Sequence, residues 1–455
     1  MARFIDILSS GAWLSRERVR LVALGVLAAS AIGLIFLVAT SDGLNDRFDR
    51  PLGTDFSNVY AAGSYVLDGH AAAPFDPARQ YAREQAIFGK GTPFYGWHYP
   101  PFFLGLAALL ATMPYWLALL TWQGVTLVLY LVSTRAILLS SPSPAGGGAR
   151  AVSARGAVRG AESSPPPGSL LYPTSPLQGA VKKEWPLLAL LLALAFPAVF
   201  INIGHGHNGF LTAALIAGAL TLIDRRPIIA GVLIGLLAYK PQFGMLIPLV
   251  LIASERWRVF ASAAVTVALL ALAVTLSFGI EVWSSFLAST GFTRTVVLEQ
   301  GGTGWYKIQS VFSWVRMWGG PVMLAYAVQG AVTLIIAAAL AWLWRMRAPF
   351  ALQAAALLIG TVLATPYSLD YDLMLLAPAI AYLAADGLQR GFSPYQKTML
   401  AALWIVPLIT RSVAEATLIP LAVPAMLLAY VFLLHRAINE TGAHLIWPFP
   451  ARSLK

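Results

Sequence analysis

Long apolar runs recur along almost the whole chain, and they constrain its folding more than any other feature. The run at 21–39 contains no charged residue, and similar runs continue to residue 434. A helix of about 20 apolar residues spans the hydrocarbon core of a bilayer. Only 11% of the 455 residues are charged, whereas soluble domains contain about 25%. The sequence therefore predicts an all-α, polytopic membrane protein. It excludes a soluble enzyme, a disordered protein and a nucleic-acid binder.

The charges indicate how the chain is oriented. Lys and Arg collect in cytoplasmic loops of membrane proteins, which accounts for the net charge of +11. Arg16, Arg18 and Arg20 precede the first run, and no small-residue cleavage site follows it. We therefore predict that 21–39 is the first span, with its basic flank in the cytoplasm, and not a cleaved signal. The chain has no cysteine, so disulfides and thiolate chemistry are excluded.

Two kinds of connection alternate along the chain. One kind is short and basic, at 224–226, 256–258, 345–347, 389–390 and 435–436. The other is almost uncharged or carries isolated polar groups, at 204–208, 239–242, 280–318, 365–372 and 411–415. If the basic connections face the cytoplasm, the others share the extracytoplasmic side with the 40–98 loop. Spans fit this alternation at 186–203, 208–223, 228–239, 241–254, 258–279, 320–344, 350–365, 372–386, 397–411 and 416–434.

The pattern predicts a single integral-membrane domain, 1–455, with about twelve spans and both termini in the cytoplasm. Residues 99–113 are expected to be re-entrant or interfacial, because a second full span there would place the basic 140–185 loop outside. That loop is rich in Ser, Pro, Gly and Ala and is expected to be disordered. The large first extracytoplasmic loop is 40–98, and 280–318 is the second. We expect the protein in a bacterial inner (cell) membrane.

Isolated polar residues gather on the predicted outer side, and in membrane proteins such residues are often functional. Asp55 follows the first span in the segment GTDFSNVY. Its carboxylate could serve as a general base on a hydroxyl. It could equally be an N-cap of a helix running through 60–67, and both roles can hold together.

Further polar residues occupy later outer connections. His98 and Tyr99 precede two prolines and are either substrate contacts or interface anchors. His205, His207 and Asn208 lie in a glycine-rich turn. They could contact a polar substrate, hold a structural metal or form a plain turn. With no third ligand evident, the metal is the weakest of these alternatives.

A lone lysine on the outer side contradicts the positive-inside tendency and needs an explanation. Lys240, followed closely by Gln242, is expected to meet an anionic phosphate, unless it snorkels into headgroups. Lys307 lies in the second outer loop. The run Asp370, Tyr371 and Asp372 could bind sugar hydroxyls or a divalent cation, or could simply cap a turn.

No Walker loop or dinucleotide fingerprint is present, so nothing indicates ATP or NAD use. The chain also has no room for the soluble α/β domain that a cytosolic nucleotide-sugar site would require. If the protein is a transferase, its donor should be linked to a lipid.

The residues resemble the membrane glycosyltransferases of family 87 over roughly 20–435. The matching motifs are Asp55 with Tyr60-Ala61-Ala62-Gly63, Tyr99-Pro100-Pro101, the 204–209 turn, Lys240-Pro241 and Tyr371-Asp372-Leu373. His207 stands where glutamine or another residue is common. The resemblance implies a C-type glycosyltransferase fold and an inverting hexosyltransferase. Its donor would be a polyprenyl-phosphate sugar, often mannose, and its acceptor a lipid or glycan hydroxyl. By the same resemblance, Asp55 is the catalytic base.

The remaining predicted substrate contacts are Tyr60, His98, Tyr99, His205, His207, Asn208, Lys240, Gln242, Lys307, Asp370, Tyr371 and Asp372. Neither a metal nor a cofactor is expected. Two alternatives stay open: a multi-span secondary transporter, and a lipid-linked polysaccharide ligase or polymerase. A transporter would place its polar groups near the midplane, and a polymerase would place its largest outer loop late in the chain. Here the polar groups gather at one face, and the largest outer loop comes first.

Overall fold

The computed structural model describes residues 2–140 and 187–442. Within these ranges the chain is helical, and its β-structure is confined to isolated bridges such as Ile308–Leu369. The all-α prediction is therefore confirmed. Most of the predicted 140–185 loop lies outside the described residues.

Seven described helices are long and apolar enough to cross a membrane. They are α2 (Arg16–Ala39), α6 (Tyr115–Ser140), α12 (Trp257–Phe278), α15 (Val322–Arg345), α17 (Leu376–Arg390) with the preceding 3-10 helix η7 (Asp370–Leu375), α18 (Gln396–Thr417) and α19 (Ala422–Thr441). The pair Leu187–Leu194 and α8 (Pro197–His205), bent by 46°, adds an eighth if it forms one span. The chain is thus an integral membrane protein.

The number of about twelve spans is not confirmed, because several predicted spans are short helices. These are α9 (Gly209–Leu222), α10 (Pro227–Gly235), α11 (Ile247–Ala253) and α16 (Phe350–Ala364). A 3-10 turn, η3 (Leu236–Tyr239), follows α10, and another, η4 (Pro241–Phe243), precedes α11, so that the two turns flank Lys240. The sequence marks these segments as apolar. Whether such short helices cross the bilayer depends on how they pack and tilt.

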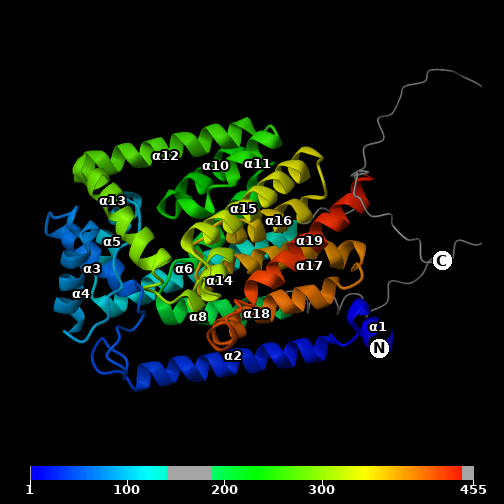
Figure 1. Cartoon of the computed structure of the whole chain (residues 1–455), viewed down its shortest axis with the longest axis horizontal. Helices are drawn as coiled ribbons and strands as arrows, with labels where there is room; N and C mark the ends of the chain where they lie inside the picture. Colours follow the sequence, from blue (N-terminus) through cyan, green and yellow to red (C-terminus); the bar gives the residue numbers. More distant parts are fainter. Residues whose placement is uncertain (1, 141–186, 443–455) are drawn as a thin grey trace, which may run out of the picture.

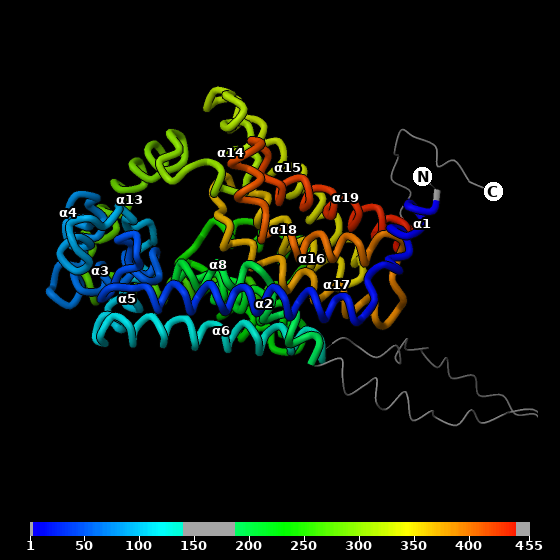
Figure 2. Tube along the Cα trace, turned by 90° about the horizontal axis from the view of Figure 1, so that it is seen from below, coloured from blue at the N-terminus to red at the C-terminus, as the bar shows by residue number. Residues whose placement is uncertain are grey.

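The helices that follow the first span gather at one end of the molecule. Both views show α3 (Phe56–Leu67), α4 (Pro77–Phe88), α5 (Leu104–Ala111) and α13 (Glu281–Phe292) at the end opposite α1 (Ala2–Ser10) (Figures 1 and 2). Helix α2 runs between the two ends along one edge of the molecule (Figure 1). The predicted loops 40–98 and 280–318 therefore both contain helices.

The 99–113 segment contains a short helix that is followed by a break. Helix α5 has eight residues and is separated from α6 by a break at 112–114. It packs closely on α3, since a Cβ added to Gly63 would lie 2.0 Å from the Ala107 carbonyl oxygen. Only glycine permits such a close approach between helix backbones.

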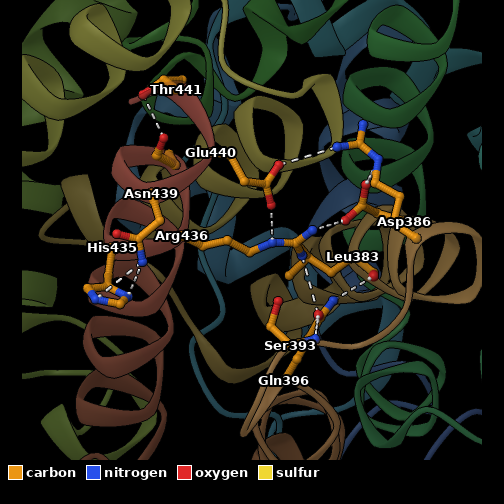
Figure 3. A network of polar contacts seen from close by, with 11 residues as sticks. Leu383, Asp386, Ser393, Gln396, His435, Arg436, Asn439, Glu440 and Thr441 are labelled. Carbon is orange, nitrogen blue, oxygen red and sulfur yellow. Dashed lines mark hydrogen bonds and ion pairs between the residues drawn. The ribbon is translucent and has the colours of Figure 1, made fainter. Parts of the chain in front are cut away.

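The basic connections meet one another away from the first-loop helices. Arg256 pairs with Asp224 at 2.9 Å and lies over the Trp344 ring. In a second cluster, buried Arg436 of α19 contacts Asp386 of α17 at 2.5 Å (Figure 3). Arg436 also contacts Glu440 at 2.6 Å and Gln396 of α18 at 3.3 Å. The contacts of Arg436 thus join three helices, α17, α18 and α19.

Removing one partner of this buried pair should strongly destabilise the protein. We expect Arg436→Ala to cost up to about 3–5 kcal/mol, because the buried Asp386 would keep only the exposed Arg390, at 3.1 Å, as its partner. Arg345→Ala is the matched control, since Arg345 is exposed at the end of α15. Thermal unfolding in detergent would measure both variants. Equal melting temperatures for the two would contradict the assigned role of the Arg436 pair.

Candidate functional site

Asp55 occupies the N-cap position of α3, but its carboxylate makes no capping hydrogen bond. Its backbone N–H donates to the His205 carbonyl at 2.9 Å and so ties the start of α3 to the end of α8. The carboxylate stays 22% exposed. The backbone therefore starts the helix, while the side chain is hydrogen-bonded to Tyr371 and does not cap α3.

His205 is the nearest basic group to Asp55. Its Nδ1 lies 2.8 Å from Thr54 Oγ1 and 3.9 Å from Asp55 Oδ2. Burial raises the pKa of the Asp55 carboxyl above its usual range. The nearby His205 and Lys307 oppose that shift, and Asp370 adds to it. A raised pKa favours proton transfer close to neutral pH.

The 204–209 turn is held rigidly against Asp55. Gly206 has φ 64°, and a Cβ there would lie 2.6 Å from the Phe56 Cβ, so the position requires glycine. Trp122 and Gln123 of α6 donate hydrogen bonds to the carbonyls of Gly206 and His207, each at 3.1 Å. The turn is thus fixed on both sides.

An aromatic stack extends from this turn. The ring centroids of His207 and Tyr371 lie 3.5 Å apart, and His205 meets Tyr371 edge-on at 5.7 Å. The Tyr99 hydroxyl lies 3.0 Å from His207 Nε2. His207 Nδ1 and Asn208 Nδ2 are buried and have no hydrogen-bond partner among the described residues. Such orphaned atoms are candidates for hydrogen bonds to a ligand or water.

Lys240 forms a buried ion pair. Its Nζ lies 2.5 Å from Asp372 Oδ1 and 3.0 Å from Asn208 Oδ1, and the residue is 5% exposed. The other Asp372 oxygen accepts the Leu369 N–H at 2.9 Å. Lys240 and Asp372, both predicted as substrate contacts, therefore bind each other across the site.

A second group of cations lies around Tyr306. Lys307 Nζ and Arg411 Cζ are each 5.7 Å from the centroid of its ring. Arg411 also pairs with Asp370 at 3.4 Å, while Lys307 has no carboxylate within 4.0 Å among the described residues. Arg411 was not among the predicted site residues. The sequence feature that could have identified Arg411 is its position as a lone arginine at a predicted outer connection.

The remaining predicted contacts lie apart from this cluster or beside it. The Tyr60 hydroxyl donates to the Met113 carbonyl at 2.9 Å, and its ring meets Tyr115 edge-on, so it packs the loop. His98 Nδ1 lies 3.0 Å from Thr293 Oγ1, and burial lowers its pKa to about 4. Gln242 is half-buried in the 3-10 turn after Lys240.

Glu84 supports the site, although it was not among the predicted site residues. It is fully buried and accepts the N–H groups of Tyr95 and Gly96 at 3.1 and 3.0 Å. Burial raises its pKa to about 7. These bonds fix the chain just before His98 and Tyr99. Its polar helical neighbours gave no sign that Glu84 is buried.

The described residues hold no cluster of three or more His, Asp or Glu side chains that could bind a metal ion. The site that they do form is a carboxylate beside a histidine, surrounded by aromatic rings, amides and cations. It contains groups for proton transfer and for binding an anion and hydroxyls.

A family model for glycosyltransferase family 87 matches residues 97–366, and the chain belongs to that family. The protein is accordingly a glycosyltransferase. The matched segment contains the histidine turn, Lys240 and Lys307, while Asp55 and Arg411 lie outside it. Comparison with curated proteins and with solved structures finds no match.

The raised pKa of Glu84 predicts a pH dependence of stability. The folded protein holds the Glu84 proton up to about pH 7, so stability should fall as the pH rises from about 4.5 to 7. The shift corresponds to about 3 kcal/mol. Glu84→Gln should flatten this dependence, whereas Glu281→Gln, at an exposed position on α13, should keep it. Melting temperatures of the three proteins between pH 4.5 and 8 test this, and parallel curves would contradict it.

Proposed function

We propose that this protein transfers a hexose, with mannose the first candidate, from a polyprenyl-phosphate sugar to a hydroxyl of a lipid or glycan. The observation that carries the proposal is the Asp55 carboxylate beside His205 and Tyr371, which is not used as a helix cap. Orphaned polar atoms and the cations at Tyr306 lie in the same site. Family membership supports glycosyl transfer over a transporter or a polysaccharide polymerase.

The proposed reaction is one inverting displacement with Asp55 as general base. The acceptor oxygen attacks the sugar C1 while Asp55 takes the hydroxyl proton. The bond between C1 and the phosphate oxygen breaks on the opposite side, and the polyprenyl phosphate leaves with the electron pair. No cofactor enters this balance. Because the phosphate is already a good leaving group, the site needs to stabilise charge more than to supply a strong acid.

Lys307 and Arg411 are the proposed contacts of the leaving phosphate. They converge on Tyr306, and Lys307 is close enough to Asp55 to affect the pKa of its carboxyl. Lys240 is assigned a different role, because Asp372 and Asn208 already occupy its ammonium group. Through these contacts Lys240 orients Asn208 beside the histidine turn.

Hydroxyl recognition is proposed for the aromatic stack and its neighbours. Tyr99, His207 and Tyr371 would form one wall, with His205 beside the base. His98, Gln242 and Asp370 remain candidate substrate contacts at the edge of the site. Tyr60 is assigned the role of supporting α3. The site lies between apolar helices, so a prenyl tail could stay in the lipid while its phosphate reaches the cations.

We also propose that the site faces the periplasm or exterior and that the termini are cytoplasmic. Two observations support this orientation: the basic connections contact one another, and the polar site is built from the other connections. A bacterial inner membrane is the proposed location, since polyprenyl-phosphate sugars are membrane lipids.

Replacing Asp55 tests the assignment. Asp55→Asn should lower kcat by about 10²- to 10⁴-fold, the usual contribution of a general base. Asp68→Asn is the control, because Asp68 lies at the other end of α3 and is 52% exposed. Transfer of labelled mannose from polyprenyl-phosphate mannose to extracted lipids would be measured in nanodiscs. An undiminished rate for Asp55→Asn would contradict the assignment.

The pH profile provides an independent check on the same residue. Because burial raises the Asp55 pKa, the acid limb of kcat/KM should lie above the usual aspartate value of about 3.9. Activity should fall as the pH decreases through that raised pKa, since the base is then protonated. The residual activity of Asp55→Asn should lack this limb. If the kcat/KM profile of Asp55→Asn kept an acid limb with the same midpoint, the titrating group would be a residue other than Asp55.

A further inference from the structure

Helices α10 and α12 pack closely and run parallel. A Cβ added to Gly231 would lie 2.4 Å from the Ser262 Cβ, and one added to Gly235 would lie 2.5 Å from the Thr266 Cβ. The Ser262 hydroxyl donates to the Ile228 carbonyl at 2.8 Å. Since 231 pairs with 262 and 235 with 266, both helices begin at the same end of the molecule, among the basic connections.

A groove of about 330 Å³ lies where these helices begin. It is lined by Arg226, Pro227, Ile228, Ile229 and Arg258. Ile228 and Ile229 are 67% and 42% exposed, so the groove has an apolar surface between two arginines. It contains none of the residues of the candidate transferase site.

The two arginines keep an uncompensated charge. Neither Arg226 nor Arg258 has a carboxylate within 4.0 Å among the described residues, whereas the neighbouring Arg256 is paired with Asp224 at 2.9 Å. Two guanidinium groups can bind a phosphate through paired N–H donors. The adjoining isoleucines would be of no use to a free phosphate, but they suit an acyl chain.

We propose that this groove, formed by residues 226–229 and 258, binds an anionic membrane phospholipid. Its phosphodiester would lie between Arg226 and Arg258, with acyl carbons against Ile228 and Ile229. Basic pockets between membrane helices on the cytoplasmic side bind anionic headgroups by this chemistry. The site is distinct from the transferase site. Helix α10 leads through η3 from the groove to Lys240, so a bound lipid would anchor the helix that carries Lys240.

Native mass spectrometry of the full-length protein in detergent tests the proposal. The probes are phosphatidylglycerol, phosphatidylcholine with the same acyl chains, and soluble glycerol 3-phosphate. Phosphatidylglycerol should bind best to the wild type. Each basic residue near an anionic surface contributes about fivefold, so R226A/R258A should weaken that binding about 25-fold.

The matched control is R345A/R347A, which removes two exposed arginines from another basic connection. It should bind phosphatidylglycerol as the wild type does. Should R226A/R258A fail to fold, Ile228→Glu provides the second test, because it places a negative charge at an exposed position of the groove. Ile228→Glu should also weaken phosphatidylglycerol binding, whereas the control variant R345A/R347A should not.

Several results would overturn the proposal. Equal binding of phosphatidylcholine would show that charge is not recognised. Binding of glycerol 3-phosphate as tight as that of the lipid would remove any role for the isoleucines. An equal loss of phosphatidylglycerol binding in R345A/R347A would show that the binding depends on net charge and not on this groove. Transferase activity is not the readout, so failure of the proposed reaction would leave this test intact.

Discussion

The buried ion pair between Lys240 and Asp372 joins the chain breaks from which the site is built. Lys240 separates two 3-10 turns, Asp372 lies in the 3-10 helix before α17, and Asn208 begins α9. Each break interrupts a helix and exposes backbone groups that a membrane cannot hydrate. The pair compensates two buried charges and fixes these three segments relative to one another. Removing either partner alone would leave an isolated buried charge, which is strongly unfavourable.

With Asp372 neutralised in this way, Asp55 remains as the carboxylate available for proton transfer. Asp55 begins a helix through its backbone and leaves its side chain 3.9 Å from His205. Arg411 partly compensates Asp370, while Lys307 keeps its positive charge near Tyr306. The carboxylates of Asp55, Asp370 and Asp372, which come from two segments of the chain, thus have three different environments. Such divergence is how one site separates a structural charge from a reactive one.

Much of the helical framework follows from apolar pattern and helix length. The predicted spans 258–279, 320–344 and 350–365 differ by at most two residues at either end from Trp257–Phe278, Val322–Arg345 and Phe350–Ala364. Asp55 stands at the predicted start of α3, but its carboxylate makes no capping hydrogen bond, and its role as base stays a prediction. The number of spans could not be predicted, because short apolar helices can either cross the bilayer or pack within it.

Side-chain partners were far less predictable, because they depend on contacts between distant segments. The partner of Lys240 lies 132 positions away, and a phosphate was expected in its place. Tyr60 belongs to a family motif but packs against Met113, and the buried Glu84 looks like a solvated helix residue in sequence. A lone polar residue can be identified from sequence as needing a partner, but only packing shows which partner it finds.

The most direct measurement is a cryo-EM structure with a non-reactive polyprenyl-phosphate mannose analogue bound. We expect the sugar beside the Asp55 carboxylate and the phosphate at Lys307 and Arg411, with the Lys240–Asp372 pair intact. A sugar bound away from Asp55, or a phosphate held by Lys240 after separation from Asp372, would contradict this expectation.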